Sequence, residues 1–275
     1  MSGARPCLLI TIAALIAAGT IIASGTALKS VRGTPAELGG SSHAVSAQRL
    51  NVLPSVILWA WDRPEDLRYL AAKRIGVSFL AETVTLGDHV LRVRPRLHPL
   101  KVLPDTPLIA CARIEIDTKH PPALTAEQLS AVASGLAGLG NLKGISALQV
   151  DFDAVRSERA LYADLLREIR RQLPPTIPLS ITALASWCTG DPWIEGLPID
   201  EAVPMLFRMG PDAEDVRLLS KGGGDFSLAI CRESVGLSTD EAIGDFPTGR
   251  RRYFFRPQGW SPAAVHAITG EEHQP

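Results

Sequence analysis

The chain has few cysteines and aromatic residues, and it carries no excess of charge of either sign. Among its 275 residues are 4 Cys and 5% aromatic residues, and its formal net charge is −1. Nucleic-acid binding needs clustered positive charge, so no nucleic-acid partner is predicted. The only dense basic run, Arg250–Arg252, opens an apolar segment and is interpreted as a solubilising cluster at a strand edge. With 46% hydrophobic residues, the chain can still build a full core.

Motifs that would indicate a bound metal or nucleotide are also missing. There is no Cys-x-x-Cys or Cys/His spacing of the kind found in structural zinc sites. No loop has the dense Asp/Asn/Gly spacing of a calcium site. No glycine-rich phosphate loop follows an early strand, and Gly222–Gly224, which precedes a predicted strand, is interpreted as a turn. The sequence therefore predicts neither a metal nor a cofactor.

The N-terminal segment is apolar and uncharged over Cys7–Leu28. It is long enough for the apolar region of a secretory signal and for a membrane-spanning helix of about 20 residues. Residues 1–29 are therefore predicted to be a cleaved signal peptide or an uncleaved membrane anchor. Both alternatives place the rest of the protein outside the cytoplasm, in the periplasm or the extracellular space. Residues 30–53, rich in Gly, Ser and Ala, are predicted to form a flexible linker.

Three cysteines follow the N-terminal segment. An exported protein lies in a compartment where disulfides form. Cys188 and Cys231 each follow a predicted strand, so they can form a bridge across one rim, or all three thiols can be free. Cys111 lies inside a predicted strand and is expected to be buried.

Residues 54–270 alternate short β-rich runs with helical or loop segments, which predicts a single α/β domain. Because about eight such repeats fit in this length, we predict a (βα)₈ TIM-like barrel. The alternative is an open doubly wound sheet, which normally carries the missing phosphate loop. The predicted strands are Val56–Trp61, Val77–Thr83, Leu108–Ile116, Ile145–Phe152, Leu179–Leu184, Ala202–Met209, Phe226–Cys231 and Tyr253–Arg256.

Helices are predicted between some of these strands. Thr125–Leu139 opens with a Thr-x-x-Gln capping pattern. Ser157–Leu173 repeats leucine or isoleucine every four residues and ends before two prolines. Pro64–Arg74 has a proline near a helix start. The later connections are short or irregular, so helices in the C-terminal half are expected to be irregular or missing.

The strand over Ile145–Phe152 ends in the polar pair Asp151 and Asp153. Side chains alternate along a strand, so both carboxylates should share one face, and catalytic groups of α/β barrels lie at the carboxyl ends of strands. Acids together with tryptophans indicate carbohydrate chemistry, in which one carboxyl protonates the leaving oxygen and a second acts as nucleophile or base. Asp153 and Glu233, which follow different predicted strands, are the predicted catalytic pair. Asp151 would orient or tune Asp153.

Residues that follow the other strands are candidates for substrate binding. Tryptophan rings can pack on sugar rings, while carboxylates and arginine bind hydroxyl groups. Two structural alternatives stay open. The tryptophans can be core residues, and Asp151 and Glu115 can be paired with Arg113 and Arg208 in a salt-bridged network. The predicted substrate-binding residues are Trp59, Trp61, Glu115, Trp187 and Arg208.

Five spaced motifs in the domain stand out together: Gln149–Ala154 (QVDFDA), Ile181–Cys188 (ITALASWC), Asp191–Trp193 (DPW), Val203–Gly210 (VPMLFRMG) and Cys231–Glu241 (CRESVGLSTDE). With these motifs the chain resembles a bacterial family known as domain of unknown function 3142. The resemblance covers residues 54–260 and implies an exported, barrel-like domain, but it implies no activity and no catalytic residue.

A weaker similarity points to the chitinase-like TIM-barrel glycosidases. Their fourth strand ends in an Asp-x-Asp-x-Glu pattern, in which Glu is the acid. Asp151 and Asp153 match both aspartates, but Val155 stands at the position of that Glu. The sequence thus favours a glycosidase-like protein acting on an envelope or extracellular polysaccharide. The alternative is a non-catalytic barrel that binds a glycan or a protein.

Overall fold

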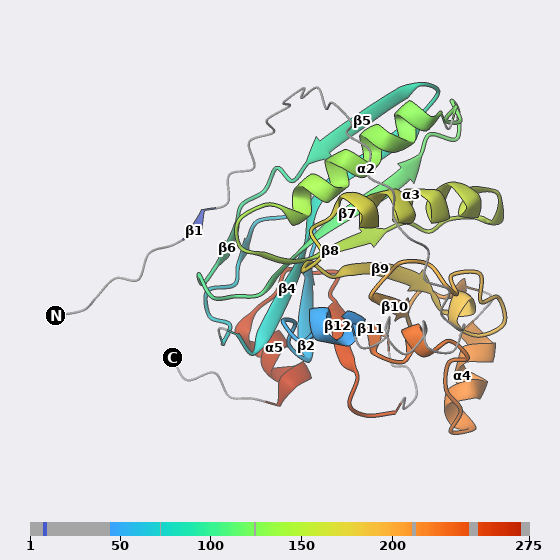
Figure 1. The fold of residues 1–275 in the computed structure, drawn as a ribbon. Helices are drawn as coiled ribbons and strands as arrows, with labels where there is room; N and C mark the ends of the chain where they lie inside the picture. Colours follow the sequence, from blue (N-terminus) through green and yellow to red (C-terminus); the bar gives the residue numbers. More distant parts are fainter. Residues whose placement is uncertain are drawn as a thin grey trace.

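A parallel barrel forms the centre of the protein (Figure 1). The structure, a computed structural model, describes residues 8–9, 45–71, 73–123, 125–210, 213–241 and 247–270. Each barrel strand pairs in parallel with the next one along the chain, and the last pairs with the first, so the sheet closes. The predicted TIM-like barrel is confirmed, and the open sheet is excluded. The barrel strands are β2 (Val56–Ala60), β4 (Ile75–Gly87), β7 (Leu108–Ile116), β8 (Ile145–Asp151), β9 (Leu179–Leu184), β10 (Glu201–Met205), β11 (Ser234–Ser238) and β12 (Arg251–Phe255).

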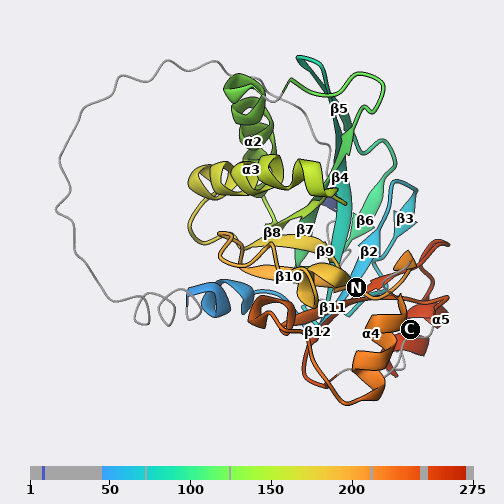
Figure 2. The same cartoon turned by 90° about the vertical axis from the view of Figure 1, so that its right-hand side faces the viewer.

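Two helices cover one side of the barrel, as predicted from their capping and periodicity. Helix α2 (Ala126–Gly140) begins after Thr125, whose hydroxyl accepts a hydrogen bond from the backbone N–H of Gln128. Helix α3 (Arg159–Gln172) follows the 3₁₀ turn η1 (Arg156–Glu158) and turns its leucines and isoleucine inward. Figures 1 and 2 show the two helices packed beside one another, outside β7 and β8.

The connections in the first part of the barrel contain no α-helix among the described residues. Strand β4 extends past the barrel and pairs with the antiparallel strand β5 (Val90–Pro95). A small second sheet holds β1 (Leu8–Leu9), β3 (Glu65–Asp66) and β6 (Leu100–Val102). The helix predicted over Pro64–Arg74 is wrong, because the N–H groups of Glu65 and Leu67 donate to carbonyls beside and within β6. Irregular connections, predicted only for the C-terminal half, therefore occur in both halves.

The remaining connections are built mainly from turns and short helices. The 3₁₀ turn η2 (Ala185–Cys188) lies between β9 and β10. Helix α4 (Ala213–Lys221) and the 3₁₀ turn η4 (Ala229–Cys231) lie between β10 and β11, and helix α5 (Pro262–Thr269) follows β12.

The seventh barrel strand lies later in the chain than predicted. The strand expected at Phe226–Cys231 is instead a turn ending in η4, and the strand is β11. A disulfide joins Cys188 to Cys231 and holds this turn against η2, which settles the choice between a bridge and free thiols. Glycine suits this position inside β11 because a Cβ on Gly236 would lie 3.0 Å from the ring of Trp59, which is a tight contact. Glycine inside a run of residues normally argues against a strand, so the sequence did not predict a strand at this position.

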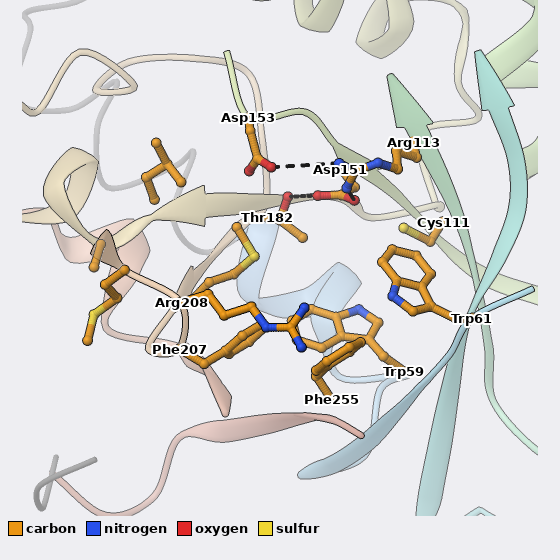
Figure 3. Close-up of a pocket in the computed structure, with 14 residues that line it drawn as sticks. Trp59, Trp61, Cys111, Arg113, Asp151, Asp153, Thr182, Phe207, Arg208 and Phe255 are labelled. Carbon is orange, nitrogen blue, oxygen red and sulfur yellow. Dashed lines mark hydrogen bonds and ion pairs between the residues drawn. The ribbon is translucent and has the colours of Figure 1, made fainter. Parts of the chain in front are cut away.

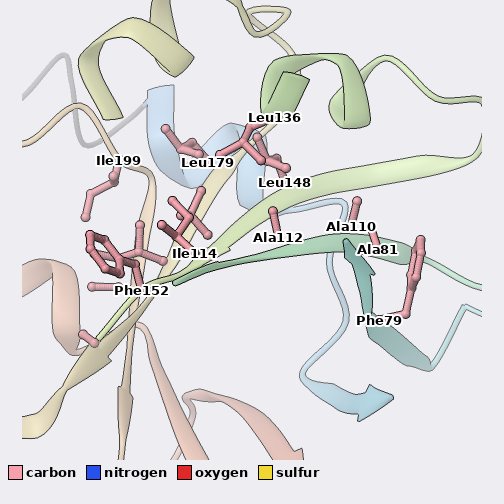
Figure 4. Packing of buried hydrophobic residues seen from close by; sticks show 14 of the residues in the cluster. Phe79, Ala81, Ala110, Ala112, Ile114, Leu136, Leu148, Phe152, Leu179 and Ile199 are labelled. Carbon is pink, nitrogen blue, oxygen red and sulfur yellow. The ribbon is translucent and has the colours of Figure 1, made fainter. Parts of the chain in front are cut away.

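Alternation along the strands divides the core into two clusters. Outward-facing residues of β7 and β8, such as Ala110, Ala112 and Leu148, pack against the helices (Figure 4). Inward-facing residues, such as Ile109 and Ala147, fill the barrel together with aromatic side chains of β2 and β12. The polar row of β8 therefore faces the barrel interior, as the strand period predicts.

The segment before β2 closes the amino-terminal end of the barrel. Residues 45–50 are helical (Figure 2). Leu50 and Leu53 are buried as part of the inner cluster. Arg49 forms an ion pair with the buried Asp200 at 2.8 Å. The flexible linker predicted over residues 30–53 is thus wrong for residues 45–53, because two leucines are buried there.

The predicted signal peptide or anchor lies outside the described residues, apart from Leu8–Leu9. Within the described ranges, no helix is both long and apolar enough to cross a membrane.

Candidate functional site

A pocket of about 270 Å³ opens at the carboxyl ends of the barrel strands (Figure 3). This is the end at which α/β barrels carry their active sites. The volume is just under the usual range for small-molecule pockets, about 300–1,000 Å³, so it suits one ring-sized unit. The lining residues are Trp59, Trp61, Cys111, Arg113, Asp151, Asp153, Thr182, Leu184, Ala185, Met205, Phe207, Arg208, Met209 and Phe255.

Asp151 is a buried carboxylate, and each of its two oxygens accepts a hydrogen bond. Its side chain is only 5% exposed. Arg113 Nη1 donates to Asp151 Oδ2 at 2.7 Å, and Thr182 Oγ1 donates to Oδ1 at 2.7 Å. A buried carboxylate held by an arginine and a hydroxyl is fixed in place. Asp151 therefore fits a positioning role, which agrees with the salt-bridged alternative.

Asp153 is the more available acid of the pair. Its side chain is 49% exposed, and Arg113 Nη2 lies 3.9 Å from its Oδ2, beyond hydrogen-bond length. Burial in the pocket raises the pKa of Asp153, the negative charge of Asp151 raises it further, and Arg113 opposes both effects. A carboxyl with a raised pKa holds its proton at a higher pH and can deliver it to a ligand.

Aromatic side chains form the opposite wall of the pocket. Phe207 and Phe255 stack with ring centroids 5.4 Å apart, and Trp61 meets Phe255 edge-on at 6.3 Å. Trp59 is mostly buried below them, where its Nε1 donates to the Oε1 of Gln149 at 2.8 Å. The wall offers flat apolar faces of the kind that bind ring compounds.

Arg208 projects into the same pocket. Its guanidinium carbon lies 5.1 Å from the ring centre of Phe255. Its backbone has a φ of 52°, a left-handed conformation that is uncommon for a residue other than glycine. The carboxylate of Glu241 accepts the backbone N–H of Arg208 at 3.0 Å and holds this turn.

Below the pocket, a chain of hydrogen bonds crosses the barrel interior. Gln149 accepts from Trp59 and Ser78 and donates to Ser180 at 3.2 Å. Ser180 and Tyr253 both donate to the fully buried Glu201. We call the group Ser78, Gln149, Ser180, Glu201, Arg251 and Tyr253 the interior network. Arg251 completes it through an ion pair with Glu201.

Three predicted site residues lie elsewhere. Glu233 directly precedes β11, at the amino-terminal end of that strand, and it does not line the pocket. The predicted Asp153–Glu233 pair is therefore wrong, because it rested on the misplaced seventh strand. Trp187 is 1% exposed and packs against Trp193 outside the barrel, so it is a core residue. Glu115 is near Arg113, at 3.3 Å, but does not line the pocket.

The structure brings together Asp151, Asp153, Trp59, Trp61 and Arg208, as predicted. Sequence reasoning offered Arg113 as a structural partner of Asp151 but did not place it beside Asp153, and it missed Thr182 entirely. Thr182 lies two residues after Ser180 on β9, so both side chains share the inward face, and strand parity was the signal that could have found Thr182. Among the residues the structure describes, no three His, Cys, Asp or Glu side chains are grouped to hold a metal ion.

Comparisons with known proteins give structural similarities and a family match. The fold is similar to a family GH18 chitinase from Chromobacterium violaceum, with 10% identity and a TM-score of 0.47, over 75% of this chain and 79% of that one. It is also similar to the Bacillus cereus spore cortex-lytic enzyme SleL, with 14% identity and a TM-score of 0.41, over 68% of this chain and 51% of that one.

A search of curated protein sequences found no match. The family match covers β7, β8, β9 and the start of β10, the strands that carry Arg113, Asp151 and Thr182. It confirms the resemblance indicated by the motifs: over residues 105–203, the chain matches the family described as Domain of unknown function (DUF3142).

Proposed function

We propose that the pocket binds one sugar unit of a polysaccharide and that the protein is a glycosidase-like, carbohydrate-binding barrel. The observation that carries the proposal is the pairing of an aromatic wall with a half-exposed acid in one pocket at the barrel mouth. Stacked rings provide an apolar face for a sugar ring, and Asp153 provides a group for its hydroxyls.

A screen of soluble oligosaccharides tests this binding. We expect Trp61→Ala to weaken binding of any oligosaccharide found by about tenfold, because a ring of the wall is lost. The matched control is Leu97→Ala, which removes a side chain that is 72% exposed and does not line the pocket. If no saccharide binds, or if both variants bind equally well, the carbohydrate proposal falls.

Hydrolysis is a second candidate, favoured by the raised pKa of Asp153. In this role Asp153 protonates the leaving oxygen as the glycosidic bond breaks, and a water molecule from solvent adds to the anomeric carbon and returns its proton to Asp153. Asp151, held by Arg113 and Thr182, orients the group beside it. The mechanism with two carboxyl groups on opposite sides of the bond lacks a second acid across the pocket among the lining residues. Hydrolysis therefore depends on this single acid.

Turnover measurements separate hydrolysis from binding. We expect Asp153→Asn to abolish any glycan cleavage and Asp153→Glu to keep part of it, since the variant keeps a carboxyl group. Sugar binding should persist in Asp153→Asn. Turnover that is equal in both variants and the unchanged protein would remove the acid role and leave the binding function.

We also place this function outside the cytoplasm. The Cys188–Cys231 disulfide supports this, because disulfides persist in oxidising compartments. In this proposal, residues 1–29 direct export, either as a cleaved signal peptide or as an uncleaved membrane anchor. Thiol labelling of fractionated cells tests it: the exported chain should be unreactive at both cysteines, whereas a chain lacking residues 1–44 should be retained with both cysteines reactive. Reactivity of Cys188 or Cys231 in the complete chain would contradict export, whereas Cys111, which is a free thiol, is expected to react in either case once the chain is unfolded.

A further inference from the structure

Four charged side chains line the pocket, and they differ in how they are compensated. Arg113 is paired with Asp151 at 2.7 Å and lies 3.9 Å from Asp153. The guanidinium of Arg208 has no carboxylate within ion-pair distance among the described residues. Glu241, the acid beside it, accepts the backbone N–H and not the side chain. Among the described residues, the pocket thus contains one positive charge with an aromatic neighbour but no carboxylate to balance it.

The position of that charge is fixed by the chain. Arg208 keeps a left-handed backbone, with a φ of 52°, in the turn directly after β10 and Phe207. Strained backbone of this kind persists where the surroundings hold it and is concentrated at ligand sites. The guanidinium lies over Phe255, 5.1 Å from its ring centre, which limits its freedom before any ligand binds.

The unpaired guanidinium and the paired acids occupy different parts of the pocket. Figure 3 shows the head group of Arg208 among the rings of Trp59, Phe207 and Phe255, apart from the Asp151–Arg113–Asp153 group. A ring stacked on the aromatic wall would therefore present one edge to Asp153 and another to Arg208. The planar fork of a guanidinium matches the two oxygens of a carboxylate.

We infer that Arg208 binds a carboxylate on the sugar, so that the pocket selects a uronic acid unit over a neutral hexose. This inference rests on the proposed carbohydrate-binding function and adds the substrate class. A neutral sugar would offer the guanidinium only hydroxyl groups as acceptors. A uronic acid offers a carboxylate, which is the opposite charge that no lining residue supplies to Arg208. A charge-assisted bond is roughly twice as strong as a neutral one.

The test compares methyl hexosides of the gluco, galacto and manno series with the corresponding methyl uronosides and their methyl esters. Binding to the full chain is measured by NMR at neutral pH. We expect at least one uronoside to bind about tenfold or more tightly than its hexoside. The methyl ester has nearly the same size but no charge, so it should bind about as weakly as the hexoside.

Substitutions at Arg208 locate the source of the preference. Arg208→Gln should bring the uronoside and hexoside affinities to within about twofold of each other, and Arg208→Lys should keep part of the difference, because charge is kept and the fork is lost. The matched control is Arg217→Gln, an exposed arginine on α4, which should leave the preference unchanged. Melting temperatures equal to that of the unchanged protein would show that each variant is folded.

The outcomes separate this inference from the function on which it rests. Hexosides that bind as well as uronosides, or a preference that survives Arg208→Gln, would overturn the role of Arg208 and leave carbohydrate binding intact. Failure of every hexoside, uronoside and oligosaccharide to bind would overturn both.

Discussion

The barrel holds two sets of buried or half-buried acids, one at each end, and they are built differently. At the amino-terminal end, Glu201 is 0% exposed and accepts hydrogen bonds from Ser180 and Tyr253 in addition to its ion pair with Arg251. At the mouth, Asp153 is 49% exposed, and its nearest cation is 3.9 Å away. The interior network is satisfied within the protein, whereas the mouth retains polar groups with capacity for a ligand.

The difference distinguishes a structural acid from a candidate functional one. A buried polar group must find partners or it destabilises the fold, so full satisfaction points to stability. A group that is partly open and has a shifted pKa points to function. Asp151 lies between these cases, because it is buried like Glu201 but supports the open acid beside it.

Breaking the interior network should have the largest effect on stability. Arg251→Gln removes the cation from the fully buried Glu201 and also removes donors to the carbonyls of Leu50 and Pro54. We expect the free energy of unfolding, measured by urea denaturation, to fall by about 3–5 kcal/mol. Arg252→Gln, at the exposed neighbouring position, is the control and should change it by less than about 0.5 kcal/mol. Equal losses in the two variants would show that the buried ion pair contributes no more to stability than an exposed arginine does.

A smaller loss is expected at the mouth. Asp151→Ala leaves the hydroxyl of Thr182 and part of Arg113 without their acceptor. Because Arg113 is 35% exposed and keeps other acids nearby, we expect a loss of about 2 kcal/mol, measured in the same way. Asp153→Ala should cost less than about 0.5 kcal/mol. A larger loss for Asp153→Ala than for Asp151→Ala would reverse the roles given to the two acids.

The smallest effect is a pH dependence due to Asp153. Its pKa in the folded protein is raised above the ordinary value of 3.8, so the folded state binds more protons than the unfolded state between the two values. Stability should therefore fall as pH rises through this window, and Asp153→Asn should remove that part of the slope. Carboxyl NMR titration gives the pKa directly. A value at or below 3.8 would contradict the proton-donor role of Asp153.

Local patterns predicted much of the fold and part of the site. The alternation in Ile145–Phe152 placed Asp151 and Asp153 on the inward face, and the capping pattern at Thr125 located the start of α2. Both predictions depend only on strand period or on contacts within one turn of helix. The helix predicted over Pro64–Arg74 failed because its backbone hydrogen bonds go to the distant strand β6.

The failures within the site have a similar origin. Glu233 was placed at the mouth because the seventh strand was assigned to an apolar run that a disulfide and burial hold in a turn. Trp187 was a candidate for the pocket, but it packs with Trp193 and Tyr162 beneath the connecting segments. In each case a contact between segments far apart in the chain decided the outcome.

The sequence by itself predicted the alternating strands and helices of an α/β domain and the inward position of its two neighbouring aspartates, because strand and helix periods are local properties of the chain. It favoured a closed barrel over an open sheet, and the pairing of β12 with β2 decided between them. Only the tertiary structure decided which charges meet. It places Arg113 beside Asp151 and leaves Asp153 half-exposed. It also places the guanidinium of Arg208 against the aromatic wall, with no acid partner among the described residues. These pairings depend on how strands from distant segments close into one barrel, and this closure fixes which side chains reach the same pocket.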